Sequence, residues 1–214
     1  MSRYGQTYAE DSNVNYFEPE INQDVYLTKF EVEHMHTEKY DGPTLLVEWT
    51  KKGSTINARK FPVNEDQITP REVNGQMQSM EDAIDKAYSD LKNWIKHIVT
   101  NYDHLLPEDK QGKFDEVTAK ADSFESLCNL AKTLLPKNTP SIKGELIVGV
   151  NKKNGFMEVP GAMWVTGHFW KVEGSDTKLQ VKTRNTVPKG YLNLDPPVQV
   201  DSKPADTPAQ DTDW

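Results

Sequence analysis

The sequence has one cysteine and no apolar run long enough to cross a bilayer. Cys128 alone cannot form an internal disulfide or a multi-cysteine zinc site, and its apolar neighbours predict a buried thiol in a reducing compartment. No stretch approaches the roughly 18 to 20 apolar residues of a membrane span. The opening MSRYGQTYAED also lacks the apolar segment of a signal peptide. We therefore expect a soluble, cytoplasmic protein without a membrane partner.

Local signatures of catalysis are also missing. The chain contains no G-x-x-x-x-G-K-[ST] loop, no G-x-G-x-x-G after a strand and no H-E-x-x-H. His34 and His36 could place two imidazoles on one strand face, but a solvent-facing strand or loop end is the favoured interpretation. A nuclease would need carboxylates around Mg²⁺, and no such cluster can be located. We expect no enzyme activity, no catalytic residue, no metal and no cofactor.

The 214 residues fit one domain with appendages. Residues 1–23 are polar and acidic and predict an N-terminal arm. Residues 24–190 predict the folded domain, with a helical insertion at about 79–136. Residues 191–214 are rich in proline and aspartate and predict a disordered acidic tail.

Within the domain, β-branched and aromatic residues predict strands over 25–33, 44–50 and 54–63, separated by turns at 41–43 and 51–53. Apolar residues spaced by three and four then predict a helix over 80–100, capped by Ser79. Pro107 predicts the start of a second helix, and a third is expected over 123–135. Strands return over 143–150, 156–159, 162–173 and 178–184. This order predicts an α+β fold with a small closed or half-closed antiparallel sheet.

The formal net charge of -8 argues at first against nucleic acid, but the charge is segregated along the chain. Residues 141–190 hold eight lysines and arginines against four acidic residues, whereas the helical middle and both ends are acidic. Cations and aromatics also alternate along the expected strands. Single-stranded nucleic acid needs both groups, because cations contact phosphates and flat rings stack on bases.

The nucleic-acid-binding candidates are the cations and rings of these strands and their turns: Lys29, Phe30, Trp49, Lys51, Lys52, Arg59, Lys60, Lys152, Lys153, Phe156, Trp164, Trp170, Lys171, Lys178, Lys182 and Arg184. Strand aromatics more often pack in a core, and this alternative is strongest for Trp49 and Phe61.

The final stretch, ADTPAQDTDW, combines negative charge with a large hydrophobe. Asp206, Asp211 and Asp213 lead to Trp214, which would offer an indole and an α-carboxylate at one point. This suits a hydrophobic pocket with a basic rim on a partner protein. The alternative is a tail that only increases solubility.

A basic sheet followed by an acidic tail with a terminal aromatic resembles the single-stranded-DNA-binding proteins of bacteriophages and bacteria. The segment QDVYLTKFEVE…TLLVEWTKKGSTINARKFPV, with helices before the remaining strands, is also similar to phage proteins of this class. The resemblance covers most of residues 24–214. It implies an OB-like antiparallel β-barrel with a three-helix insertion and disordered polar termini.

The resemblance further implies a non-enzymatic protein that coats single-stranded DNA in phage DNA replication, recombination and repair, in the host-cell cytoplasm. Its tail would recruit replication or recombination proteins such as a DNA polymerase or a helicase, and self-association into a homo-oligomer is compatible with this class. A different class is the alternative: a virion or assembly protein that docks other proteins through its tail.

Overall fold

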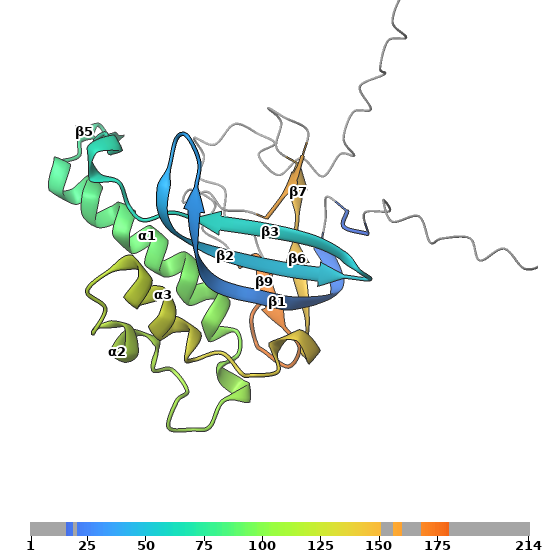
Figure 1. Cartoon of the computed structure of the whole chain (residues 1–214). Helices are drawn as coiled ribbons and strands as arrows, with labels where there is room; N and C mark the ends of the chain where they lie inside the picture. The colour runs from blue at the N-terminus through green and yellow to red at the C-terminus, as the bar shows by residue number, and fades with distance from the viewer. Residues whose placement is uncertain (1–15, 19–20, 151–155, 160–167, 180–214) are drawn as a thin grey trace, which may run out of the picture.

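A curved antiparallel sheet forms the centre of the molecule in the computed structural model, which describes residues 16–18, 21–150, 156–159 and 168–179 (Figure 1). Its five strands follow the order β3-β2-β1-β6-β9. Their bounds are Ile21–His36 for β1, Asp41–Lys51 for β2, Ser54–Lys60 for β3, Lys143–Ile147 for β6 and Trp170–Val172 for β9.

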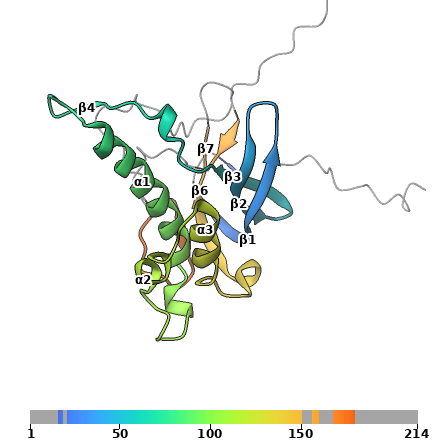
Figure 2. The same cartoon turned by 60° about the vertical axis from the view of Figure 1, so that its left-hand side comes forward.

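Strand β1 holds the sheet together because it pairs with two neighbours. Its later part, from Tyr26 to His36, pairs with β2, and its first part pairs with β6. The register shifts between Leu27 and Lys29 on the β2 side, and between Asn22 and Val25 on the β6 side. Such irregularities bend a strand, and the long central strand β1 is visibly curved in Figures 1 and 2.

The smaller elements lie at the margins of this sheet. Strands β4 (Glu72–Val73) and β5 (Gln76–Met77) form one hairpin, while β7 (Gly149–Val150) pairs with β8 (Met157–Glu158). Strand β8 packs against β3. Single 3₁₀ turns cover Glu65–Gln67, Asp103–Leu105 and Thr139–Ser141.

The helices lie between β3 and β6 in the chain, as predicted. Helix α1 spans Met80–Thr100, and the Ser79 hydroxyl caps it by accepting the Asp82 N–H at 3.0 Å. Helix α3 spans Phe124–Lys132. The predicted second helix begins later than Pro107, because residues 107–112 form turns and α2 spans only Phe114–Thr118.

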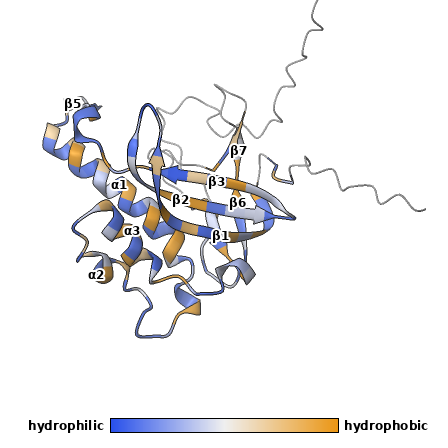
Figure 3. Ribbon diagram, viewed as in Figure 1, coloured by the Kyte–Doolittle hydropathy of each residue, from blue (hydrophilic) through white to orange (hydrophobic). Residues whose placement is uncertain are grey.

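One hydrophobic core joins the helices to the sheet. Leu27, Val47 and Trp49 from the sheet are buried together with Ile95 and other residues of α1. Figure 3 shows the corresponding alternation of hydrophobic and hydrophilic residues along the helix ribbons. The predicted burial of Cys128 is confirmed, and that burial raises the pKa of its thiol to about 12.

The predicted α+β class and the antiparallel sheet are thus confirmed, but the predicted closure of the sheet into a barrel is not. The described strands form an open sheet whose edges are β3 and β9. The ordered fold also begins before residue 24, because Phe17 is buried in the core and β1 begins at Ile21. Among the described residues, no helix has the length and apolar character of a membrane span.

Candidate nucleic-acid interface

A cation and an aromatic ring meet at the turn between β2 and β3. Lys52 and Gly53 both have positive φ, at 49° and 85°, as a two-residue type I′ hairpin turn requires. The Lys52 ammonium lies 5.7 Å from the centroid of the Tyr16 ring. The Tyr16 N–H donates to the Ser54 hydroxyl at 3.1 Å, which holds the backbone of Tyr16 beside the hairpin. Tyr16 keeps 42% of its surface exposed.

A second group of this kind lies at the opposite end of β3. The Lys60 ammonium lies 4.4 Å from the centroid of the Trp94 ring on α1. The next residue, Phe61, is 43% exposed, and the edge of Tyr40 meets its ring at 4.9 Å between centroids. Burial of the Lys60 ammonium lowers its pKa to about 8, so the group is still mostly charged at pH 7.

A third exposed ring belongs to the segment that packs against β3. Phe156 precedes β8 and is 71% exposed. Together with Tyr16 and Phe61 it places flat apolar surface around β3. Of these three rings, only Phe156 is among the predicted nucleic-acid-binding residues. Phe61 was expected in the core, but it follows the last residue of β3 and is 43% exposed.

Three of the predicted stacking rings are core residues instead. Phe30 is 5% exposed, and Trp49 and Trp170 are fully buried. The two indoles pack 6.2 Å apart between centroids. Trp170 also covers Gly144 of β6, where the Cβ of any residue other than glycine would overlap the indole. These rings have no free face for a base, so their part in stacking is corrected here. Alternation along a strand does not distinguish the buried face from the exposed face.

Two of the predicted phosphate contacts are engaged within the sheet. Lys29 donates to the Glu33 carboxylate at 2.7 Å, and Arg59 contacts the same residue at 3.2 Å. Arg59 also donates to the Thr44 hydroxyl at 2.6 Å. The Lys29 hydrogen bond, followed by that of Arg59, holds the pKa of the Glu33 carboxyl below its ordinary value. Glu31 and Glu48 also act on Lys29, so the carboxylates here offset the two cations and this face of the sheet is not basic.

The remaining predicted cations are dispersed. Lys51 donates to the Asn22 amide oxygen at 2.9 Å. Lys171 lines a hollow together with the acidic residues Asp24, Glu145 and Glu173, while Lys178 is exposed at the rim of another cavity. The other predicted positions lie outside the described residues: Lys152, Lys153, Trp164, Lys182, Arg184, Asp206, Asp211, Asp213 and Trp214.

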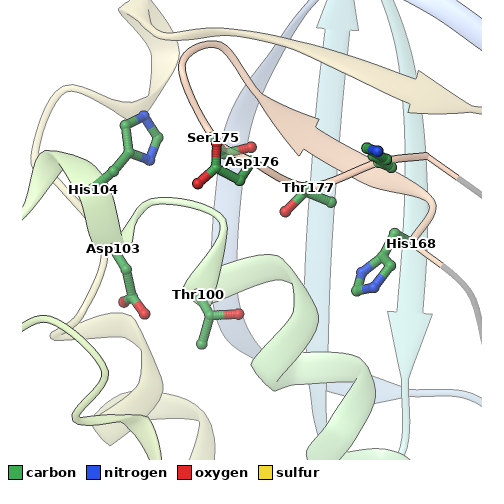
Figure 4. A pocket seen from close by; sticks show the side chains of 8 residues that line it. Thr100, Asp103, His104, His168, Ser175, Asp176 and Thr177 are labelled. Carbon is green, nitrogen blue, oxygen red and sulfur yellow. The ribbon is translucent and has the colours of Figure 1, made fainter.

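The cavity next to Lys178 was not anticipated from the sequence. It has a volume of about 480 Å³ and is lined by polar side chains, seven of which are labelled in Figure 4: Thr100, Asp103, His104, His168, Ser175, Asp176 and Thr177. These residues come from the end of α1 and from the segment around β9, which are far apart in the chain. Burial raises the pKa of the Asp103 carboxyl.

The polar side chains that line this cavity are not arranged for catalysis. His104 bonds the Glu173 carbonyl at 2.9 Å, and the Thr100 hydroxyl donates to the Lys96 carbonyl. Within the described residues, no lining hydroxyl is hydrogen-bonded to an imidazole, as activation of a nucleophile would require. The β3 groups therefore remain the better candidate interface.

A half-buried histidine connects the cavity wall to the sheet. His97 accepts the backbone N–H groups of Phe169 and Trp170 through Nε2, at 3.2 and 3.1 Å. Its proton must therefore reside on Nδ1, which donates to Nδ1 of His168 at 3.2 Å. Burial, and to a lesser extent the nearby His168, lowers the pKa of His97 to about 3. His97 is thus a neutral anchor between α1 and β9.

The chain matches no protein-family model, no curated protein and no solved structure in the comparisons made. The structure itself therefore describes the class of protein: an α+β protein with an antiparallel sheet and a cation–aromatic group at each end of the edge strand β3.

Proposed function

We propose that this protein binds single-stranded DNA without sequence preference and coats exposed strands in phage DNA replication, recombination and repair. The observation that carries the proposal is the pair of cation–aromatic groups at the two ends of β3, Lys52 with Tyr16 and Lys60 with Trp94 and Phe61. Between them, β3 spans roughly 20 Å, which accommodates a few nucleotides. A sequence-tolerant site requires cations beside exposed rings, and Tyr16 and Phe61 supply the exposed rings, whereas Trp94 is half-buried and stacks on Phe169.

The strand order supports an OB-like architecture for this function. In an OB fold, strands one to five form a ring in the order 1-2-3-5-4, with a helix between strands three and four. Numbering β1, β2, β3, β6 and β9 as one to five gives the same ring, opened between strands three and five. Strand β8 packs against β3 at this opening, and α1, α2 and α3 occupy the position of the helix.

The basic segment and the acidic tail complete the proposal. Lys152, Lys153, Lys182 and Arg184 would supply further phosphate contacts. The tail ending in Trp214 would recruit a polymerase, a helicase or another replication or recombination protein. The charge balance on the β1–β2 face favours binding along β3 rather than across the whole sheet.

Fluorescence anisotropy of labelled oligo-dT at several salt concentrations tests the proposal. Affinity should fall steeply with salt, because phosphate contacts release counterions. Replacing Tyr16 or Phe61 by alanine should cost about 1–3 kcal/mol of binding free energy per stacked base. Replacing Lys52 by alanine should reduce the slope of log affinity against log salt by about 0.7.

Matched controls lie on the helical side of the molecule. Tyr88 on α1 is 48% exposed, like Tyr16 and Phe61, and Lys110 is an exposed cation away from β3. Tyr88→Ala and Lys110→Ala should bind oligo-dT like the wild type. Absence of binding at low salt would overturn the proposal and favour the virion or assembly protein, which size-exclusion chromatography with and without DNA would then examine.

A further inference from the structure

Two imidazoles and a carboxylate converge where β1 ends and β2 begins. His34 and His36 share one face of β1, and His36 is paired in register with Asp41. Nε2 of His34 lies 2.8 Å from Asp41 Oδ1, and Nδ1 of His36 lies 2.6 Å from the same oxygen. The two imidazole centroids are 4.4 Å apart. This hairpin extends beyond the rest of the sheet in Figure 2.

The loop that joins these residues is ordered by its own hydrogen bonds. The Thr37 N–H donates to the Tyr40 carbonyl at 2.8 Å, and the Thr37 hydroxyl accepts the Tyr40 N–H at 3.0 Å. The Tyr40 hydroxyl donates to the Pro43 carbonyl at 2.6 Å. The backbone between His36 and Asp41 is therefore fixed before any ligand binds, which lowers the entropic cost of bringing the three side chains together.

The donor atoms suit a late first-row divalent cation. One ring nitrogen each from His34 and His36 and a carboxylate oxygen of Asp41 all lie within 4.8 Å of one another. Around a zinc ion, imidazole nitrogens and carboxylate oxygens bind at about 2.0–2.2 Å, so modest side-chain rotations would place all three in contact with one ion. Two imidazoles and one carboxylate form a ligand set used by zinc and by non-haem iron, and they leave at least one coordination position open.

We propose that His34, His36 and Asp41 form a divalent transition-metal site, with Zn²⁺ as the fitting ion. The sequence favoured a solvent-facing strand end for these histidines, and their side chains are exposed, but the hairpin register brings Asp41 between them. The ion would replace the hydrogen bonds that now link the three groups. Tyr40, next to Asp41, packs against Phe61 at 4.9 Å between ring centroids, so the site adjoins the second β3 group. None of its three ligands belongs to that group, and ion binding does not require DNA.

Isothermal titration of the full-length protein with ZnCl₂ at pH 7.5 tests this assignment. We expect one ion per chain, with His36→Ala and Asp41→Asn each weakening the affinity roughly tenfold or more, because even outer-shell changes at metal sites cost 10–100-fold. His104→Ala removes an exposed histidine elsewhere and should leave the affinity unchanged.

Long-range ¹H–¹⁵N spectra of the histidine side chains supply a second measurement. Zn²⁺ should shift the ring nitrogens of two histidines in the wild type, and the double variant His34→Ala/His36→Ala should lose both of these signals and their shifts. Circular dichroism would establish that each variant is folded. Equal Zn²⁺ affinity in the wild type and the double variant would overturn the site, because binding would then reside in the acidic segments. No measurable Zn²⁺ binding by the wild type would also overturn the site and would show that the three side chains form only a surface ion pair.

Discussion

His97 holds the β9 end of the sheet against α1 without carrying a charge. Its Nε2 accepts two backbone N–H groups, and its pKa is lowered from an ordinary value of 6.5 to about 3. The unfolded chain therefore binds a proton below pH 6.5 that the folded chain does not bind until about pH 3. Since the unfolded state holds more protons in this range, stability falls as the pH falls.

We expect the free energy of unfolding to decrease between pH 7.5 and pH 4.5, and His97→Gln to reduce this dependence. A glutamine side-chain oxygen can accept backbone N–H groups but does not titrate. Urea unfolding at both pH values measures the effect. His104→Gln, at an exposed histidine, is the control. The same pH dependence in His97→Gln and the wild type would show that other groups cause the acid sensitivity.

At the scale of elements, the pairing of β6 with β9 depends on Gly144. A Cβ at this position would overlap the Trp170 ring and lie only 2.5 Å from the Lys171 carbonyl oxygen. Gly144 is opposite Val172 in the register, so the strand itself obstructs any added side chain. The large buried indole of Trp170 is accommodated because β6 has no side chain at this point.

Gly144→Ala should therefore destabilise the protein by about 1–3 kcal/mol, the usual cost of overpacking. Urea denaturation followed by circular dichroism measures the change. Glu145→Ala, at the next and partly exposed residue of β6, should change stability far less. If both variants unfolded at the same urea concentration, the close approach of Trp170 to Gly144 would have no energetic role.

Periodicity was sufficient to predict α1 and the presence of the first three strands, and turn chemistry predicted the Lys52–Gly53 hairpin turn. The turn expected at 41–43 was wrong, because the loop lies at 37–40 and β2 already begins at Asp41. The second helix was misplaced because Pro107 signals only a change of backbone direction. The residues that follow it contribute nothing to the core, and α2 begins at Phe114, whose side chain is buried. The site was harder to predict. The core alternative named for Trp49 is confirmed, but burial of Trp170, pairing of Arg59 with Glu33, and the meeting of His36 with Asp41 all depend on strand register.

At the scale of the whole molecule, charge is divided between the helices and the sheet. The cations of α1 are paired locally, with Lys92 and Lys96 both contacting Asp115. Lys52 lies over a ring instead, at the end of β3. The acidic tail carries Asp206, Asp211 and Asp213. A negatively charged segment tethered to the same chain would compete with phosphate for the cations at β3.

Deleting residues 195–214 should therefore tighten oligo-dT binding at low salt. The difference should shrink as salt rises, because screening weakens the attraction between the tail and the cations.

Trp214→Ala keeps every aspartate, so DNA affinity should be unchanged while capture of a replication partner is lost. Anisotropy titrations at low and high salt measure the first effect, and pull-down with immobilised wild-type or Trp214→Ala protein measures the second. Equal DNA affinity of the full-length and truncated chains at low salt would refute competition by the tail, and loss of both activities in Trp214→Ala would assign the indole to DNA binding.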